Sequence, residues 1–166
     1  MRSKAFFING GAGRVITSIP AFEKYAETHD DFIIVCEGGM NFYKSHPVLH
    51  KYAYDNWHKG LFEDKIKDRD CVTPEPYRRW HYYNQKCSIA QAFDLEINGI
   101  DEPRDLPKPT IKLAKSEGIQ GLQLVDEAIK VTGKEKVIVV QPFGRGVHDE
   151  GGYIFDPTSR SFNLGD

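Results

Sequence analysis

Two short apolar runs near the start of the chain each end in glycines, which is the pattern of buried parallel strands. They cover residues 4–9 (KAFFIN) and residues 32–37 (FIIVCE). Between them, residues 14–28 carry apolar side chains at helical spacing, and Pro20 is expected to bend this helix rather than end it. A strand, a helix and a second strand joined this closely predict a right-handed βαβ unit.

The central part of the chain gives weaker patterns as far as residue 87. A helical turn, two short strands and a helix are predicted at residues 42–45, 52–54, 71–73 and 77–86. Residues 88–98 predict a helix more clearly, because Ser88 is a suitable N-cap and Gly99 a suitable stop.

The last third of the chain changes character. Residues 101–109 (DEPRDLPKP) are rich in proline and charge and predict a linker or surface loop. Residues 116–132 predict a helix, and residues 136–141 (KVIVVQ) another buried strand. We therefore expect an α/β fold in residues 1–133, with a Rossmann-like parallel sheet flanked by helices. Residues 134–166 are expected to begin a second domain whose remainder is absent or lies on another chain.

The composition is that of a globular protein, with 40% apolar and 28% charged residues, and 166 residues suffice for one α/β domain. A formal net charge of −2 argues against a general polyanion binder. Cys36, Cys71 and Cys87 form no CxxC pair and no metal-ligand spacing, so we expect a reducing cytoplasm and no bound metal. No apolar run approaches the ~20 residues that span a bilayer, so no membrane partner is expected.

The turn after the first predicted strand is the leading candidate for a binding element. Gly10, Gly11 and Gly13 let the backbone approach a phosphate or a sugar closely, and the helix that follows offers free N–H groups. The spacing is neither the GxGxxG dinucleotide fingerprint nor a phosphate-binding loop that ends in Gly-Lys-Ser/Thr. A tight turn that only permits close packing of strand and helix is the alternative explanation.

Several segments, taken in order, resemble the heptosyltransferase-like glycosyltransferases of the GT-B fold. They are GRVITSIPAF at residues 13–22, the strand at 32–37, HPV at 46–48, VIVVQPFGR at 137–145 and SRSF at 159–162. The overall order is also similar to that of T-even-type phage glycosyltransferases, which decorate hydroxymethylcytosine in phage DNA. The resemblance implies the acceptor-side, N-terminal half of a GT-B enzyme. It also implies sugar transfer from a nucleotide-sugar co-substrate, without another cofactor, and donor contacts from Gly144, Arg145 and Arg160.

One position departs from that family, whose glycine loop ends in an aspartate that acts as the general base. This chain has Arg14 there, and an arginine stays charged at neutral pH and cannot deprotonate an alcohol. Arg14 is therefore expected to bind a phosphate, and the base must lie elsewhere. Glu37, at the end of the second strand, and Asp55 are the candidate catalytic residues, ahead of His46 and His58. Capping the next helix is the alternative role for Glu37.

Residues 44–86 carry nine Lys and Arg against six Asp and Glu, with tyrosines and tryptophans interleaved. Basic side chains contact phosphates, and aromatic rings stack on flipped bases or sugar faces. Arg78, Arg79 and Trp80 are therefore predicted acceptor contacts, with DNA as the candidate acceptor. A solvated helix face over core aromatics is the alternative. Two other functions stay open: a non-catalytic module that binds nucleic acid or a protein partner, and a nucleotide- or phosphate-dependent enzyme of another class.

Overall fold

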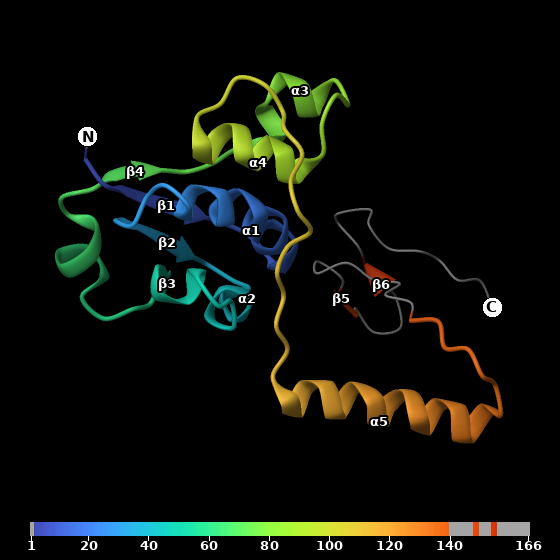
Figure 1. Ribbon diagram of the computed structural model, residues 1–166. Coiled ribbons are helices and arrows are strands. Elements are labelled where there is room, and N and C mark those ends of the chain that lie inside the picture. The colour runs from blue at the N-terminus through green and yellow to red at the C-terminus, as the bar shows by residue number, and fades with distance from the viewer. Residues whose placement is uncertain (1, 140–147, 150–153, 156–166) are drawn as a thin grey trace. The chain divides into compact units, whose positions relative to one another are not determined.

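The computed structural model describes residues 2–139, 148–149 and 154–155 (Figure 1). The chain divides into two compact units, Met1–Ala114 and Lys115–Asp166. The sequence placed the boundary after residue 133, whereas this division falls before the long helix that precedes Gly133.

Four parallel strands form the sheet of the first unit, in the order β3-β2-β1-β4 (Figure 1). Their bounds are Lys4–Ile8 (β1), Phe32–Cys36 (β2), Ala53–Asp55 (β3) and Asp70–Val72 (β4). In the register of the sheet, Phe6 lies opposite Ile34 on one side and Val72 on the other. The α/β fold class with a Rossmann-like parallel sheet is therefore confirmed, as are the two short strands predicted in the central part of the chain.

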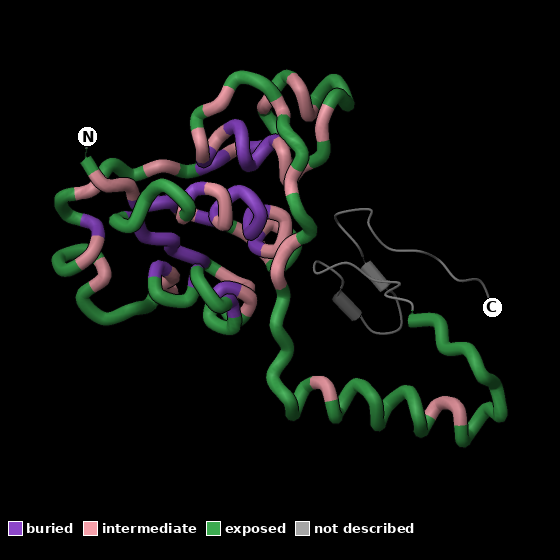
Figure 2. Tube along the Cα trace, viewed as in Figure 1, coloured by how far each residue is buried: buried purple, intermediate pink, exposed green. Residues whose placement is uncertain are grey.

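Helices cover one face of this sheet. Their bounds are Ala12–Ala26 (α1), Met40–Lys44 (α2) and Ile89–Asn98 (α4), and the short 3-10 helix Leu49–Lys51 (η1) follows α2. The core between helices and strands is aromatic: the ring of Phe6 lies 5.3 Å from that of Phe22 and 6.4 Å from that of Phe32. Figure 2 shows this buried layer in purple, running through β1, β2, α1 and α4. Pro20 lies inside α1, which continues past it as predicted.

The opposite face of the sheet is covered by a segment that the sequence patterns did not predict. A single-turn π-helix, η2 (Phe62–Ile66), brings Ile66 against Ala5, Ile33 and Val35. A π-helix follows neither the helical period of 3.6 nor the strand period of 2, so pattern matching does not detect it.

Helix α4 confirms the prediction for residues 88–98 together with both of its end signals. Ser88 and Gln91 form a capping box: the Gln91 N–H donates to Ser88 Oγ at 3.3 Å, and the Ser88 N–H donates to Gln91 Oε1 at 2.9 Å. Gly99 ends the helix in the left-handed region, with φ of 63°.

The single helix predicted for residues 77–86 is wrong, because the segment is broken in two. A 3-10 helix, η3 (Pro76–Arg78), is followed by one turn of α-helix, α3 (Trp80–Tyr83). Arg79 between them is extended, with ψ of 131°. Its guanidinium donates to the Leu95 carbonyl at 3.1 Å and so ties the break to α4.

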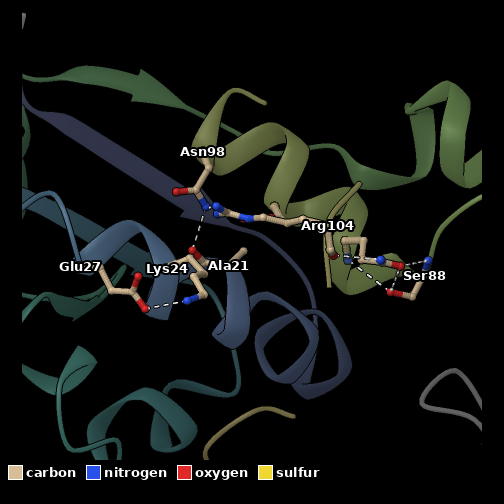
Figure 3. A network of polar contacts seen from close by, with 8 residues as sticks. Ala21, Lys24, Glu27, Ser88, Asn98 and Arg104 are labelled. Carbon is tan, nitrogen blue, oxygen red and sulfur yellow. Dashed lines mark hydrogen bonds and ion pairs between the residues drawn. The ribbon is translucent and has the colours of Figure 1, made fainter. Parts of the chain in front are cut away.

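Residues 101–109 contain no helix or strand, as predicted for a surface loop, but the loop is fastened to the rest of the first unit. Arg104 donates to the fully buried Asp94 twice, from Nε to Oδ2 at 2.6 Å and from Nη2 to Oδ1 at 2.9 Å. Asn98 donates to the same carboxylate at 2.6 Å. Asn98 also donates to the Ala21 carbonyl at 3.0 Å, a contact drawn as a dashed line in Figure 3. One buried carboxylate thereby connects the loop and α4, and Asn98 extends the connection to α1.

The second unit is dominated by α5 (Lys115–Thr132), which confirms the predicted helix and has no buried residue. The strand predicted for residues 136–141 is wrong over residues 136–139, which are not in a strand. Ile138 is 86% exposed and Val139 is 90% exposed. An apolar run becomes a buried strand only beside other strands. In the described part of this unit, β5 (His148–Asp149) and β6 (Ile154–Phe155) pair with each other instead.

Candidate functional site

The carboxyl ends of the four parallel strands meet at one edge of the sheet, which is where open α/β sheets bind their ligands. The residues that follow the strands there are Asn9, Glu37, Asn56 and Thr73, after β1, β2, β3 and β4 respectively. Because β2 lies between β1 and β3, Glu37 is next to the loops of both neighbouring strands.

The loops after β1 and β2 pack directly against each other, and glycines make this possible. A Cβ at Gly38 would lie 3.2 Å from the Gly10 carbonyl oxygen, and one at Gly39 would lie 3.0 Å from the Ala12 Cα. Gly10 and Gly39 also have φ of 103° and 71°, which side chains disfavour. Close packing therefore accounts for these three glycines without a ligand.

Gly11 and Gly13, which the sequence assigned to the substrate, are not explained by packing in the same way. Gly11 is the N-cap of α1 and makes no side-chain cap hydrogen bond. A Cβ at Gly13 would meet nothing within 4 Å, so the space beside the first turn of α1 is open. This is the part of the loop that a ligand can reach.

Glu37 is exposed and spans the two glycine loops. Its Oε2 accepts a hydrogen bond from the Gly10 N–H at 3.2 Å, while Oε1 has no hydrogen-bond partner in the described part of the chain. The carboxylate is therefore held in place at the strand edge by one oxygen and can accept a proton from a bound molecule with the other.

Asp55, the second candidate base, ends the neighbouring strand β3 and lies opposite Cys36. Its Oδ1 accepts the Trp57 N–H at 2.9 Å and closes a turn. Burial raises the pKa of the Cys36 thiol to about 12, and the charge of Asp55 adds to this rise. Asp55 is half-buried and its Oδ1 closes the turn, so its carboxylate is less accessible than that of Glu37 to an incoming hydroxyl.

The Arg14 side chain is contacted by the segment that follows β4. Its Nη2 donates to the Pro74 carbonyl at 2.8 Å and lies 3.5 Å from Glu75 Oε1. Its guanidinium carbon is 5.5 Å from the centre of the Tyr77 ring and 5.7 Å from that of Phe93. With 18% of its side chain exposed, Arg14 joins the start of α1 to this segment, and a phosphate would have to compete with these partners.

The three predicted acceptor contacts lie in the same segment and differ in availability. Arg79 is bound to α4, with Nε 2.5 Å from Glu96 Oε1. Trp80 is 63% exposed. Arg78 is exposed, and its side chain has no partner in the described part of the chain. Arg78 and Trp80 are therefore available to a ligand, whereas Arg79 mainly holds the segment in place.

The sequence did not identify the partners of Arg14 and of His46. His46 is 2% exposed, accepts the Val48 and Leu49 N–H groups on Nδ1 at 3.1 and 3.0 Å, and contacts Glu23 through Nε2 at 2.9 Å. With both ring nitrogens occupied, His46 cannot serve as a base. Glu23 lies 23 positions earlier in the chain, and no local spacing indicates such a pair.

The predicted donor contacts Gly144, Arg145 and Arg160 lie outside the described residues. Among the residues that the structure describes, no cluster of His, Cys, Asp or Glu could hold a metal ion. No helix in that part of the chain is long and apolar enough to cross a membrane.

Comparison with known proteins gives no family for this chain. No protein-family model matches it, and neither a curated protein nor a solved structure matches it significantly. The geometry of the strand edge and its neighbouring segment is therefore the basis for assigning a function.

Proposed function

We propose that this chain is the acceptor-side half of a glycosyltransferase that uses a nucleotide sugar. The observation that carries the proposal is the exposed carboxylate of Glu37, held 3.2 Å from the Gly10 N–H at the carboxyl end of a central parallel strand. Exposed carboxylates at this edge of an α/β sheet are well placed for general base catalysis.

In the proposed reaction, Glu37 takes the proton from an acceptor hydroxyl. The oxygen then attacks the anomeric carbon of the donor, the bond from that carbon to the diphosphate breaks, and the nucleoside diphosphate leaves. Each carboxylate accepts one backbone N–H, and Glu37 is preferred to Asp55 because Glu37 is exposed whereas Asp55 is half-buried. The open space beside Gly13, in the same glycine loop as Gly10, gives the acceptor room to bind.

We propose hydroxymethylcytosine in DNA as the acceptor, with Arg78 on the phosphates and Trp80 on a base. The donor would bind chiefly to a second domain, with Gly144, Arg145 and Arg160 at its margin. The three cysteines are unpaired, which supports a reducing cytoplasm as the location. In this proposal the 166-residue chain alone binds acceptor but does not turn over.

Two measurements on the isolated chain test the proposal. Calorimetric titration with a duplex that contains hydroxymethylcytosine should give tighter binding than the same duplex with cytosine, because the extra hydroxyl donates to Glu37. Glu37→Gln should reduce that preference and leave the fold intact, since its carboxamide oxygen can still accept the Gly10 N–H. Equal binding of both duplexes by the wild type would contradict an acceptor site at Glu37. Robust sugar transfer by the isolated chain would contradict the division into two halves.

A non-catalytic module that binds nucleic acid is the second candidate, and Arg14 favours it. Arg14 stands where the heptosyltransferase-like enzymes have their catalytic base, and its side chain contacts Pro74, Glu75 and Tyr77. If this candidate is correct, the affinity for a duplex should not depend on the hydroxymethyl group, on Glu37→Gln or on any nucleotide sugar. The same titrations therefore separate the two functions.

A further inference from the structure

The segment that contains η3 and α3 forms a pocket whose lining residues have no role in the proposed reaction. It has a volume of about 460 Å³ and is lined by Tyr77, Tyr82, Tyr83, Gln85 and Cys87. We refer to it as the tyrosine pocket. Three of its five lining residues are aromatic rings with a hydroxyl at the tip, which is a lining suited to flat ligands with polar edges.

One wall of the tyrosine pocket is held rigid. The Tyr77 ring meets Tyr82 edge-on at 5.7 Å, and the Arg14 guanidinium lies 5.5 Å from the same ring. The wall is thus fixed before any ligand arrives, which reduces the entropy cost of binding. Tyr83, by contrast, is 80% exposed and offers its ring to a ligand from solvent.

Gln85 occupies a backbone position that ordinarily belongs to glycine. It has φ of 56° and is the only non-glycine residue with positive φ in the described part of the chain. Gln85 ends α3 in a Schellman motif. The Gln85 N–H donates to the Tyr82 carbonyl at 3.0 Å, and the Lys86 N–H donates to the His81 carbonyl at 2.7 Å. A side chain retained where glycine is more stable indicates a role for that side chain. A carboxamide presents both a donor and an acceptor to a ligand.

Two basic residues adjoin lining residues of the tyrosine pocket along the chain, because Arg78 follows Tyr77 and Lys86 stands between Gln85 and Cys87. Arg78 and Lys86 are exposed, and neither side chain has a partner in the described part of the chain. The other basic groups of this segment are matched, Arg79 by Glu96 and His81 by Glu102. A neutral sugar would stack on the tyrosines without needing these two free cations, whereas a nucleotide uses both the rings and the cations.

From these features we infer that the tyrosine pocket binds a nucleobase, stacked on Tyr83 and contacted at its edge by Gln85, with Arg78 and Lys86 on the adjoining phosphates. Arg78 also serves as a phosphate contact in the proposed acceptor site, but the pocket itself is separate from Glu37, so the inference holds whether or not Glu37 is a base. The base can belong to a free nucleotide or to an unpaired position in a nucleic-acid strand, and the experiment distinguishes these sources.

Fluorescence anisotropy with a labelled single-stranded oligonucleotide tests the inference. Loss of one base–aromatic stack costs about 1–3 kcal/mol, so Tyr83→Ala should raise the Kd about 5- to 150-fold. Phe62→Ala is the matched control, because Phe62 is an aromatic residue, 60% exposed, that lies outside the pocket. Arg78→Gln should weaken binding and lower the salt slope by ~0.7, the value for one phosphate of a single strand. Glu37→Gln should leave this binding unchanged, so failure of the proposed catalytic base is distinguishable from failure of the pocket.

Cysteine alkylation locates the ligand independently of affinity. Cys87 lines the pocket and Cys71 is exposed outside it, so a bound base should slow alkylation of Cys87 and spare that of Cys71. Protection by mononucleotides identifies a free nucleotide as the ligand, and protection by oligonucleotides alone identifies a strand; both support the inference. Protection by a neutral oligosaccharide instead, or no effect of Tyr83→Ala on either readout, would overturn it.

Discussion

Arg104→Ala should destabilise the first unit, because it removes the ion-pair partner of the buried Asp94 carboxylate. Asp94 lies on α4 and is fully buried, and Arg104 supplies two of its hydrogen bonds, at 2.6 and 2.9 Å. Those contacts also raise the pKa of the Arg104 guanidinium above its usual value. Removing the arginine leaves Asn98 as the one side-chain donor to Asp94 among the residues that the structure describes.

The expected cost follows from these contacts. Hydrogen bonds to charged groups contribute about 1.5–3 kcal/mol each, and breaking a buried ion pair by removing one partner costs about 3–5 kcal/mol. The Arg104 side chain is 43% exposed, so water can enter and replace part of the guanidinium. We therefore expect the free energy of unfolding to fall by about 3 kcal/mol, at the lower end of that range.

Urea unfolding followed by far-UV circular dichroism measures this cost. Lys67→Ala is the control, because it removes an ion pair with Glu63 in which both side chains are exposed, 60% and 67%. Such a pair contributes about 0–1 kcal/mol. Limited proteolysis of residues 101–109 supplies a second readout, since the loop should become cleavable in Arg104→Ala. If Arg104→Ala costs no more than Lys67→Ala and the loop stays protected, Asp94 does not hold the loop.

Three further predictions concern single residues of the first unit. Burial and the Asp55 charge raise the pKa of Cys36 from its ordinary value of 9.0 to about 12. Because the folded state favours the neutral thiol, Cys36 contributes its full stabilisation below pH 9 and loses it as the pH rises towards 12. Urea unfolding should accordingly lose stability above pH 9 more steeply in the wild type than in Cys36→Ala, and a thiol reagent should label Cys71 in the folded protein but not Cys36. Gln85→Gly should raise the free energy of unfolding by about 1 kcal/mol in urea titrations, because glycine adopts a positive φ without strain; a loss of stability would contradict the assignment of strain. Ser88→Ala should lower the free energy of unfolding by about 1 kcal/mol by removing a capping box, and no change would mean that the cap is dispensable.

Local pattern was sufficient for the elements that lie in the middle of the sheet or carry their own end signals. The apolar runs of β1 and β2 are buried on both faces, and α4 begins and ends at its cap residues. Residues 137–139 form an equally apolar run, yet they are exposed, because a strand also needs neighbours that local sequence does not reveal.

Tertiary pairing explains what the sequence could not predict about the site. Arg14 was assigned to a phosphate from its place after the glycine loop, but its Pro74 partner lies 60 residues further on. Asp94 interrupts the apolar face of α4. Its burial is explained by its ion pair with Arg104, which lies in the loop predicted to be a linker. Glu37 was identified correctly as lying at the strand edge, since the end of a buried strand is readable from the sequence.

We propose above all that Glu37 and the glycine loops form the acceptor site of a sugar-transfer enzyme. Backbone amide NMR tests it most directly, with the Gly10 N–H as the reporter, because its hydrogen bond to Glu37 changes when the carboxylate engages a hydroxyl. A duplex with hydroxymethylcytosine should shift the Gly10 amide, the cytosine duplex should not, and Glu37→Gln should abolish the difference. Shifts that are identical for the two duplexes, or confined to the tyrosine pocket, would contradict it.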